Sequence, residues 1–464
     1  MPASRFGPAQ SGFGGASNKK LNALPPECRR SATLPAPKSY TLSILARDLD
    51  PGFGLHGRRL LGKPSPVLIR LLHLSPLLLL FVGCRSVQTA APHTATWDLA
   101  ALNSVPAAEW GGTTGLVQEV YYQGEPYRGK PTRIFAYLGR PATGNGLFPA
   151  MVLVHGGGGK AFRDWAEHWA SRGYVALAMD TAGCGPNGPL PDGGPDQADT
   201  TKFRNFAEDE TRDMWTYHAV SAVIRGVSLL AALPEVDRRR IGITGISWGG
   251  YLTCIVAGLD HRLKVAVPVY GCGFLGDNSV WKATSLAQMR PEARDRWLRD
   301  FDPSQHLGGV NCPSLFLNGA SDFAYPLDSY RASYRLVPAK FRHVSVVPGL
   351  PHGHIWTFDE VDVFVDSALR GGIPLPRLGR MEIHGDRVSA KVISPVPIKH
   401  AALHFTPDTG EWQKRRWQTV PAELKGNTIS ARLPGQRPLA CYLSVTDERG
   451  LRVSTEHEEC SASR

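Results

Sequence analysis

The chain has 464 residues, 42% of them hydrophobic and 20% charged, an ordinary balance for a globular protein long enough for two domains. Its formal net charge is +11, of which roughly +7 falls within residues 1–66. The rest of the chain is only mildly basic and has no Lys/Arg-rich run interleaved with aromatic residues. This composition argues against nucleic-acid binding.

Residues 1–66 are rich in Pro, Gly, Ser and Ala, and we expect them to be disordered or to be an extension upstream of a true start near Val67. Over 67–84, Arg70 precedes a short apolar run that ends at Cys84. This is the pattern of a secretory signal, too short to span a membrane. The Cys after a small residue resembles the lipobox of bacterial lipoproteins, which implies lipidation at Cys84. A plain signal peptide and a buried apolar helix stay open. We therefore expect export to the periplasm or cell envelope.

After a linker over 85–114, residues 115–372 alternate short β-branched runs with helical stretches. This alternation is typical of a mostly parallel sheet with helices on both faces, an α/β class of fold. A long Gly-, Pro- and Asp-rich loop over 181–201 interrupts it, and we expect this loop to lie over the functional site. The strands that we expect are Arg133–Leu138, Ala150–His155, Tyr174–Asp180, Arg240–Gly245, Lys264–Tyr270, Ser314–Asn318 and His343–Val347.

Residues 376–464 contain short strands separated by turn signals. Regular spacing of this kind predicts a small accessory β-sandwich of the immunoglobulin or fibronectin type. Trp412 and Trp417 either fill its core or line a sugar-binding face. Cys441 and Cys460 either pair or remain as buried thiols.

The segment Gly245-Ile246-Ser247-Trp248-Gly249 joins an expected strand to an expected helix. A GxSxG motif in this context is typical of a nucleophile elbow, in which glycines let a tight turn expose the serine hydroxyl. Ser247 is therefore the candidate nucleophile.

A glycine-rich loop, His155-Gly156-Gly157-Gly158-Gly159, follows an apolar strand about 90 residues before Ser247. Backbone N–H groups of Gly157 or Gly158, together with that of Trp248, would form an oxyanion hole. The competing interpretation as a phosphate loop fails, because Val154 and Ala161 stand where such a loop needs Gly and Ser/Thr.

A serine nucleophile needs a base, and the base needs an orienting carboxylate. Asp322 follows the strand Ser314–Asn318, with Asp328 as the alternative. For the base, His354 is favoured over its neighbour His352, which would pack or bond beside it.

Tyr270, Phe323 and Trp356 are candidate pocket walls, although aromatic residues at such places are as often core residues. The cysteines show no CxxC or Cys/His ligand spacing, so we expect no metal site. The chemistry requires no cofactor.

Four segments, HGGGGKAF (155–162), RIGITGISWGGYL (240–252), PVYGCGF (268–274) and PHGH (351–354), resemble the dienelactone hydrolase and acetylxylan esterase branch of the α/β-hydrolases. This branch borders the catalytic domain of prolyl oligopeptidases. The resemblance implies hydrolysis of a small-molecule or carbohydrate ester, such as an acetyl ester, through an acyl-enzyme. A prolyl oligopeptidase-like serine peptidase is the alternative, and a non-catalytic binding module is the third hypothesis.

Overall fold

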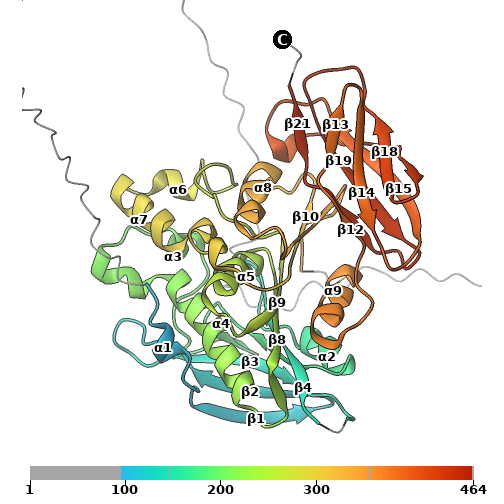
Figure 1. Ribbon diagram of the computed structural model, residues 1–464. Coiled ribbons are helices and arrows are strands. Elements are labelled where there is room, and N and C mark those ends of the chain that lie inside the picture. The colour runs from blue at the N-terminus through green and yellow to red at the C-terminus, as the bar shows by residue number, and fades with distance from the viewer. Residues whose placement is uncertain (1–95, 145, 355, 357, 462–464) are drawn as a thin grey trace, which may run out of the picture. The chain divides into compact units, whose positions relative to one another are not determined.

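The structure is a computed structural model that describes residues 96–144, 146–354, 356 and 358–461 (Figure 1). The predictions for 1–66, for the signal over 67–84 and for lipidation at Cys84 lie outside these ranges. Within them, no helix combines the length and the apolar character needed to cross a membrane.

A nine-stranded sheet runs through the first two thirds of the described chain, in the order β1-β2-β3-β5-β4-β8-β9-β10-β11. The strands from β5 to β11 pair in parallel, whereas β1, β2 and β3 are antiparallel. Strands β4, β5 and β10 are almost wholly buried, as expected for parallel strands covered on both faces. The bounds are β1 Ala108–Thr114, β2 Val117–Gln123, β3 Arg133–Gly139, β4 Phe148–Val154, β5 Val175–Met179, β8 Val236–Ile246, β9 Leu263–Val269, β10 Ser314–Gly319 and β11 Arg342–Val347.

Helices cover both faces of the sheet (Figure 1). Helices α2 (Arg163–Ser171) and α9 (Asp359–Arg370) pack on one face, and α4 (Trp215–Ala232) and α5 (Trp248–Leu259) pack together on the other. Helix α8 (Leu327–Leu336) lies on the side of α5, where the Tyr330 hydroxyl donates to the Pro268 and Leu317 carbonyls. The predicted α/β-hydrolase architecture is confirmed. The other helices are α1 Leu99–Leu102, α3 Asp199–Lys202, α6 Ser285–Gln288 and α7 Pro291–Phe301.

Regular structure is present before the expected domain boundary at 115. Trp97 is buried and donates its indole N–H to the Tyr217 carbonyl at 3.1 Å. Strand β1 then forms the outer edge of the sheet, within the segment expected to be a linker. That expectation is corrected for residues 97–114, because this stretch pairs with β2 and is anchored by Trp97.

The expected loop over 181–201 is mostly irregular, with a small hairpin of β6 (Cys184–Gly185) and β7 (Gly188–Pro189). The C-terminal part consists of antiparallel sheets, as predicted. Its strands are β12 Arg377–Leu378, β13 Glu382–His384, β14 Arg387–Ile393, β15 Ile398–Thr406, β16 Gln418–Pro421, β17 Glu423–Lys425, β18 Thr428–Arg432, β19 Leu439–Asp447, β20 Arg452–Ser454 and β21 Glu458–Cys460. Cys441 and Cys460 are free thiols on the paired strands β19 and β21.

The β-module (residues 376–461) covers the edge strand β11 of the large sheet. The Val346 N–H donates to Ser454 Oγ at 2.9 Å, and Ser345 Oγ donates to the Arg452 carbonyl at 3.0 Å. These bonds satisfy polar groups on a strand edge that would otherwise be open.

Candidate active site

Ser247 stands at the turn between β8 and α5, the strand–helix junction that the sequence predicts. Its backbone is strained, with φ 59° and ψ −117°, as in a nucleophile elbow. A Cβ on Gly249 would lie 2.0 Å from the Val154 carbonyl oxygen, and one on Gly245 would lie 2.3 Å from the Gly249 carbonyl oxygen. The elbow therefore requires glycine at both positions.

The glycine-rich loop packs directly onto this elbow. A Cβ on Gly156 would lie 2.8 Å from Ser247 Cβ, and one on Gly157 would lie 2.9 Å from Cδ1 of Trp248. Within the described residues, the N–H groups of Gly157 and Gly158 have no hydrogen-bond partner. The N–H of Trp248 opens helix α5, where first-turn N–H groups have no acceptor inside the helix. Free donors are therefore available beside the serine, where an oxyanion hole is expected.

Asp322 is completely buried at the carboxyl end of β10, and its carboxylate is held from two sides. Its Oδ1 accepts the N–H groups of Ala324 and Tyr325 at 2.9 and 2.8 Å. Its Oδ2 accepts a bond from Nδ1 of His352 at 2.6 Å. The expected pairing with His354 is thus corrected: the carboxylate orients His352.

His354 has a different partner. Its Nε2 accepts the N–H of Gly156 at 2.9 Å, and its ring packs against Phe162. Burial is the main cause that lowers its pKa to about 4, so this ring stays neutral near pH 7. A nitrogen that already accepts a backbone N–H is poorly placed to receive a serine proton. The alternative carboxylate Asp328 accepts from the Asn278 amide through both oxygens, and within the described residues it makes no hydrogen bond or ion pair with either histidine.

Two of the three expected pocket residues contact His352. The Tyr270 ring stacks on it at 4.4 Å, and Phe323, half exposed, lies at 4.9 Å on a tilted plane. Tyr270 is buried and donates its hydroxyl to the Pro351 carbonyl at 2.8 Å, so it supports the histidine loop. The third, Trp356, packs against the α2 residues Trp165 and Trp169.

His155 links the glycine-rich loop to the long loop that follows β5. Its Nδ1 bonds the Gly156 carbonyl at 2.7 Å, and its Nε2 accepts the Thr181 N–H at 2.9 Å. Burial lowers the pKa of His155 to about 4 and raises that of the neighbouring Asp180 to about 6. The Asp180 carboxylate accepts the N–H groups of Ala182 and Cys184 at 2.8 and 2.7 Å.

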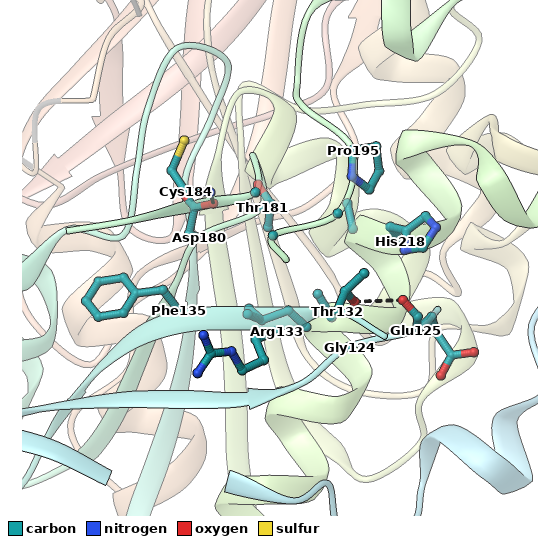
Figure 2. A pocket seen from close by; sticks show the side chains of 16 residues that line it. Gly124, Glu125, Thr132, Arg133, Phe135, Asp180, Thr181, Cys184, Pro195 and His218 are labelled. Carbon is teal, nitrogen blue, oxygen red and sulfur yellow. Dashed lines mark hydrogen bonds between the residues drawn. The ribbon is translucent and has the colours of Figure 1, made fainter. Parts of the chain in front are cut away.

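Behind this junction lies a cavity of about 30 Å³, enough for about one water molecule (Figure 2). Asp180, Thr181 and His218 line it, and Thr132 on the opposite wall donates to the Glu125 carbonyl at 2.7 Å. It is too small for an ester substrate. His218 is a buried residue of helix α4.

The end of the long loop packs against Trp248, the predicted oxyanion donor. The buried Lys202 ammonium lies 4.8 Å from the centre of the Trp248 ring, 3.0 Å from an Asp199 carboxylate oxygen and 2.5 Å from the Gln197 carbonyl. Burial lowers its pKa. Sequence reasoning missed this residue, because a lone lysine in a polar loop carries no pattern. The described residues contain no cluster of His, Cys, Asp and Glu suited to a metal.

Ser247, the free N–H groups and the Asp322–His352 pair together suit acyl transfer. Comparison with known proteins agrees: residues 104–307 match the family model described as acetyl xylan esterase (AXE1). The chain is a carboxylesterase-like hydrolase. The resemblance to the acetylxylan esterase and dienelactone hydrolase branch is confirmed.

Known relatives of this hydrolase have modest identity. A Salmonella typhimurium protein named "Putative carboxymethylenebutenolidase" is 26% identical over 240 residues, covering 51% of this chain and 78% of that protein. The acetyl esterase Axe7A of Xylanibacter ruminicola is 26% identical over 141 residues, covering 29% of this chain and 31% of its own. The solved acetyl xylan esterase from Paenibacillus sp. R4 is 22% identical with a TM-score of 0.48, covering 58% of this chain and 92% of that one.

Proposed function

We propose that the protein hydrolyses carboxylic esters of small molecules or carbohydrates through a triad of Ser247, His352 and Asp322. The main support is the 2.6 Å hydrogen bond from His352 to the buried carboxylate of Asp322. Asp322 and the strained Ser247 elbow both lie at the carboxyl ends of parallel strands of the same sheet. This set is what a hydroxyl nucleophile needs to react near neutral pH.

In this mechanism His352 donates its Nδ1–H to Asp322, which leaves the Nε2 lone pair free to act as a base. Nε2 takes the Ser247 proton as Oγ attacks the ester carbonyl. The N–H groups of Gly157 and Trp248 stabilise the oxyanion. His352 then returns the proton to the leaving alcohol, and an acyl-enzyme forms. Water, deprotonated by the same histidine, releases the acid and restores Ser247.

We propose a short acyl group, such as acetyl. Bulky rings surround the residue that follows the nucleophile: Trp248 is buried, and the ring centres of Trp281 and Trp215 lie 4.5 and 5.6 Å from its ring. The family match over 104–307 supports the same choice.

We also propose that the protein is exported, with Cys84 as a lipid anchor. Support comes from the basic residue, the apolar run and the small residue before Cys84 over 67–84. N-terminal sequencing and intact mass of the native protein test this. A mature chain that begins at a lipidated Cys84 is expected, and a retained Met1 would contradict export.

The esterase proposal is tested with p-nitrophenyl acetate, acetylated xylan and Gly-Pro-p-nitroanilide, each with the wild type and with Ser247→Ala. We expect ester turnover that disappears in the variant. Dominant amide turnover would favour the peptidase alternative. A wild type that is inert toward all three substrates would favour a binding module.

A further inference from the structure

The β-module contacts the loop that carries the acid of the triad. The indole N–H of Trp417 donates to the Ala320 carbonyl at 3.1 Å, and Ser321 Oγ donates to the Arg415 carbonyl at 2.8 Å. Ala320 and Ser321 immediately precede Asp322. Two hydrogen bonds from another part of the chain therefore hold the approach to the catalytic carboxylate.

The contacting segment, residues 412–417, is itself firmly held. The Arg415 guanidinium lies 3.5 Å from the centre of the Trp412 ring, which packs on His457 at 4.8 Å. The Trp417 ring meets Tyr442 of β19 edge to face at 5.1 Å. Trp412 and Trp417 therefore pack within the β-module, and Trp417 also bonds the catalytic domain. These contacts disfavour the alternative in which the two rings bind sugar.

The β-module also braces the strand that leads to the base. Its bonds to Ser345 and Val346 lie on β11, which ends five residues before His352. Arg335 of α8 and Arg342, the first residue of β11, pair with opposite oxygens of Glu456 at 2.6 and 2.9 Å. The β-module therefore contacts the neighbouring strand β11, which precedes His352, and the end of β10, which precedes Asp322.

We propose that the β-module positions the triad, with Trp417 and Ser321 as positioning residues that fix the Asp322 loop against His352. This inference rests on the proposed function. The bond that Asp322 accepts from His352 sets the tautomer and the direction of the His352 ring, and small misplacements of a catalytic group cost large factors in rate. A module that resembles an accessory domain is in this way part of the catalytic machinery.

The test uses Trp417→Phe, which keeps a ring but removes the donor to Ala320, and Ser321→Ala, which removes the donor to Arg415 from an exposed side chain. The matched control is Tyr442→Phe, because the Tyr442 hydroxyl has no hydrogen-bond partner within the described residues. The readouts are kcat and KM for p-nitrophenyl acetate, the pH dependence of kcat/KM, and Tm.

We expect each donor variant to lower kcat about 10-fold with KM nearly unchanged. We also expect the acidic limb of the kcat/KM–pH profile, which reports protonation of His352, to shift. Tyr442→Phe is expected to match the wild type. Wild-type kcat and pH profiles in both donor variants, with or without a lower Tm, would overturn the inference. Should Trp417→Phe fail to fold, Ser321→Ala decides alone. Asp322→Asn separates the two proposals: if it keeps full activity, the triad itself is wrong.

Discussion

Two histidines separated by one residue follow strand β11, and their hydrogen bonds give them different chemistry. His352 offers Nδ1–H to Asp322 at 2.6 Å, which leaves its other nitrogen free to take a proton. His354 Nε2 accepts the N–H of Gly156 at 2.9 Å, and this bond holds the glycine-rich loop. The first ring is suited to be a base, and the second to hold the donors of the oxyanion hole in place.

His352→Ala and His354→Ala should therefore differ sharply. Loss of the base is expected to lower kcat/KM about 10³-fold or more. Loss of the loop contact is expected to lower it about 10-fold, because the oxyanion donors lose a support but remain. Hydrolysis of p-nitrophenyl acetate by the two variants measures both. A greater loss of kcat/KM in His354→Ala than in His352→Ala would show that His354 is the base.

The sequence predicted Ser247, Asp322 and the glycine-rich loop because each follows a recognisable buried strand. It favoured His354 over His352 as the base, whereas Asp322 bonds His352, and the error arose because both histidines follow the same strand within one short loop. Only the direction of each ring decides which one meets the carboxylate. The supporting roles of Lys202 and Trp417 depend on contacts between distant segments and carry no local signal.

The elbow between β8 and α5 brings three elements within atomic contact: the end of β8, the start of α5 and the end of β4. Gly249 is where they are closest, since any Cβ there would meet the Val154 carbonyl oxygen at 2.0 Å. That carbonyl belongs to the strand that leads into the glycine-rich loop. A shift at Gly249 therefore moves the nucleophile and the oxyanion donors together.

Gly249→Ala is expected to abolish ester hydrolysis and to lower the free energy of unfolding by several kcal/mol, on the order of the largest overpacking effects. Gly112→Ala in strand β1 is the matched control, because a Cβ there meets nothing within 4 Å. Activity and Tm of the two purified variants provide the comparison. An active Gly249→Ala protein with the wild-type Tm would show that the elbow is looser than described.

The strands of the parallel sheet were predicted to within about two residues from their apolar residues, except that β8 begins at Val236 and not at the expected Arg240. The start of β8 was missed because it is polar, with Asp237 followed by three arginines. Strand β1 was missed because six of its seven residues are exposed, so it shows no alternation. Pairing with β2 creates that strand, and Trp97 anchors the segment before it. Tertiary contacts of this kind leave no pattern in the local sequence.

Buried histidines are distributed over the whole protein, and they make its stability sensitive to acid. Burial lowers the pKa of His155, His218, His343, His354 and His404 to about 4 in each case. In the unfolded chain these groups titrate near 6.5. As pH falls from about 6.5 toward 4 the unfolded chain binds protons that the folded chain does not, so stability is lost across that window. The raised pKa of Asp180 offsets part of this loss.

His404→Gln is expected to reduce the slope of the unfolding free energy against pH, because it removes about one proton from the difference in proton binding between the unfolded and folded chains. His404 bonds Thr419 and Ser444 at 2.9 and 2.8 Å in the β-module, away from the catalytic residues, and Gln does not titrate. Urea unfolding of wild type and variant between pH 4 and 8 gives the slopes. Equal slopes, or a wild type whose stability rises as pH falls through this window, would contradict the assignment.

The central claim is that Ser247 is a nucleophile activated by His352. Fluorophosphonate labelling of the native protein, followed by peptide mass mapping, tests it most directly. We predict one labelled site, at Ser247, and a labelling rate that collapses in His352→Ala. Labelling at another serine, or unchanged labelling of Ser247 in His352→Ala, would contradict the account.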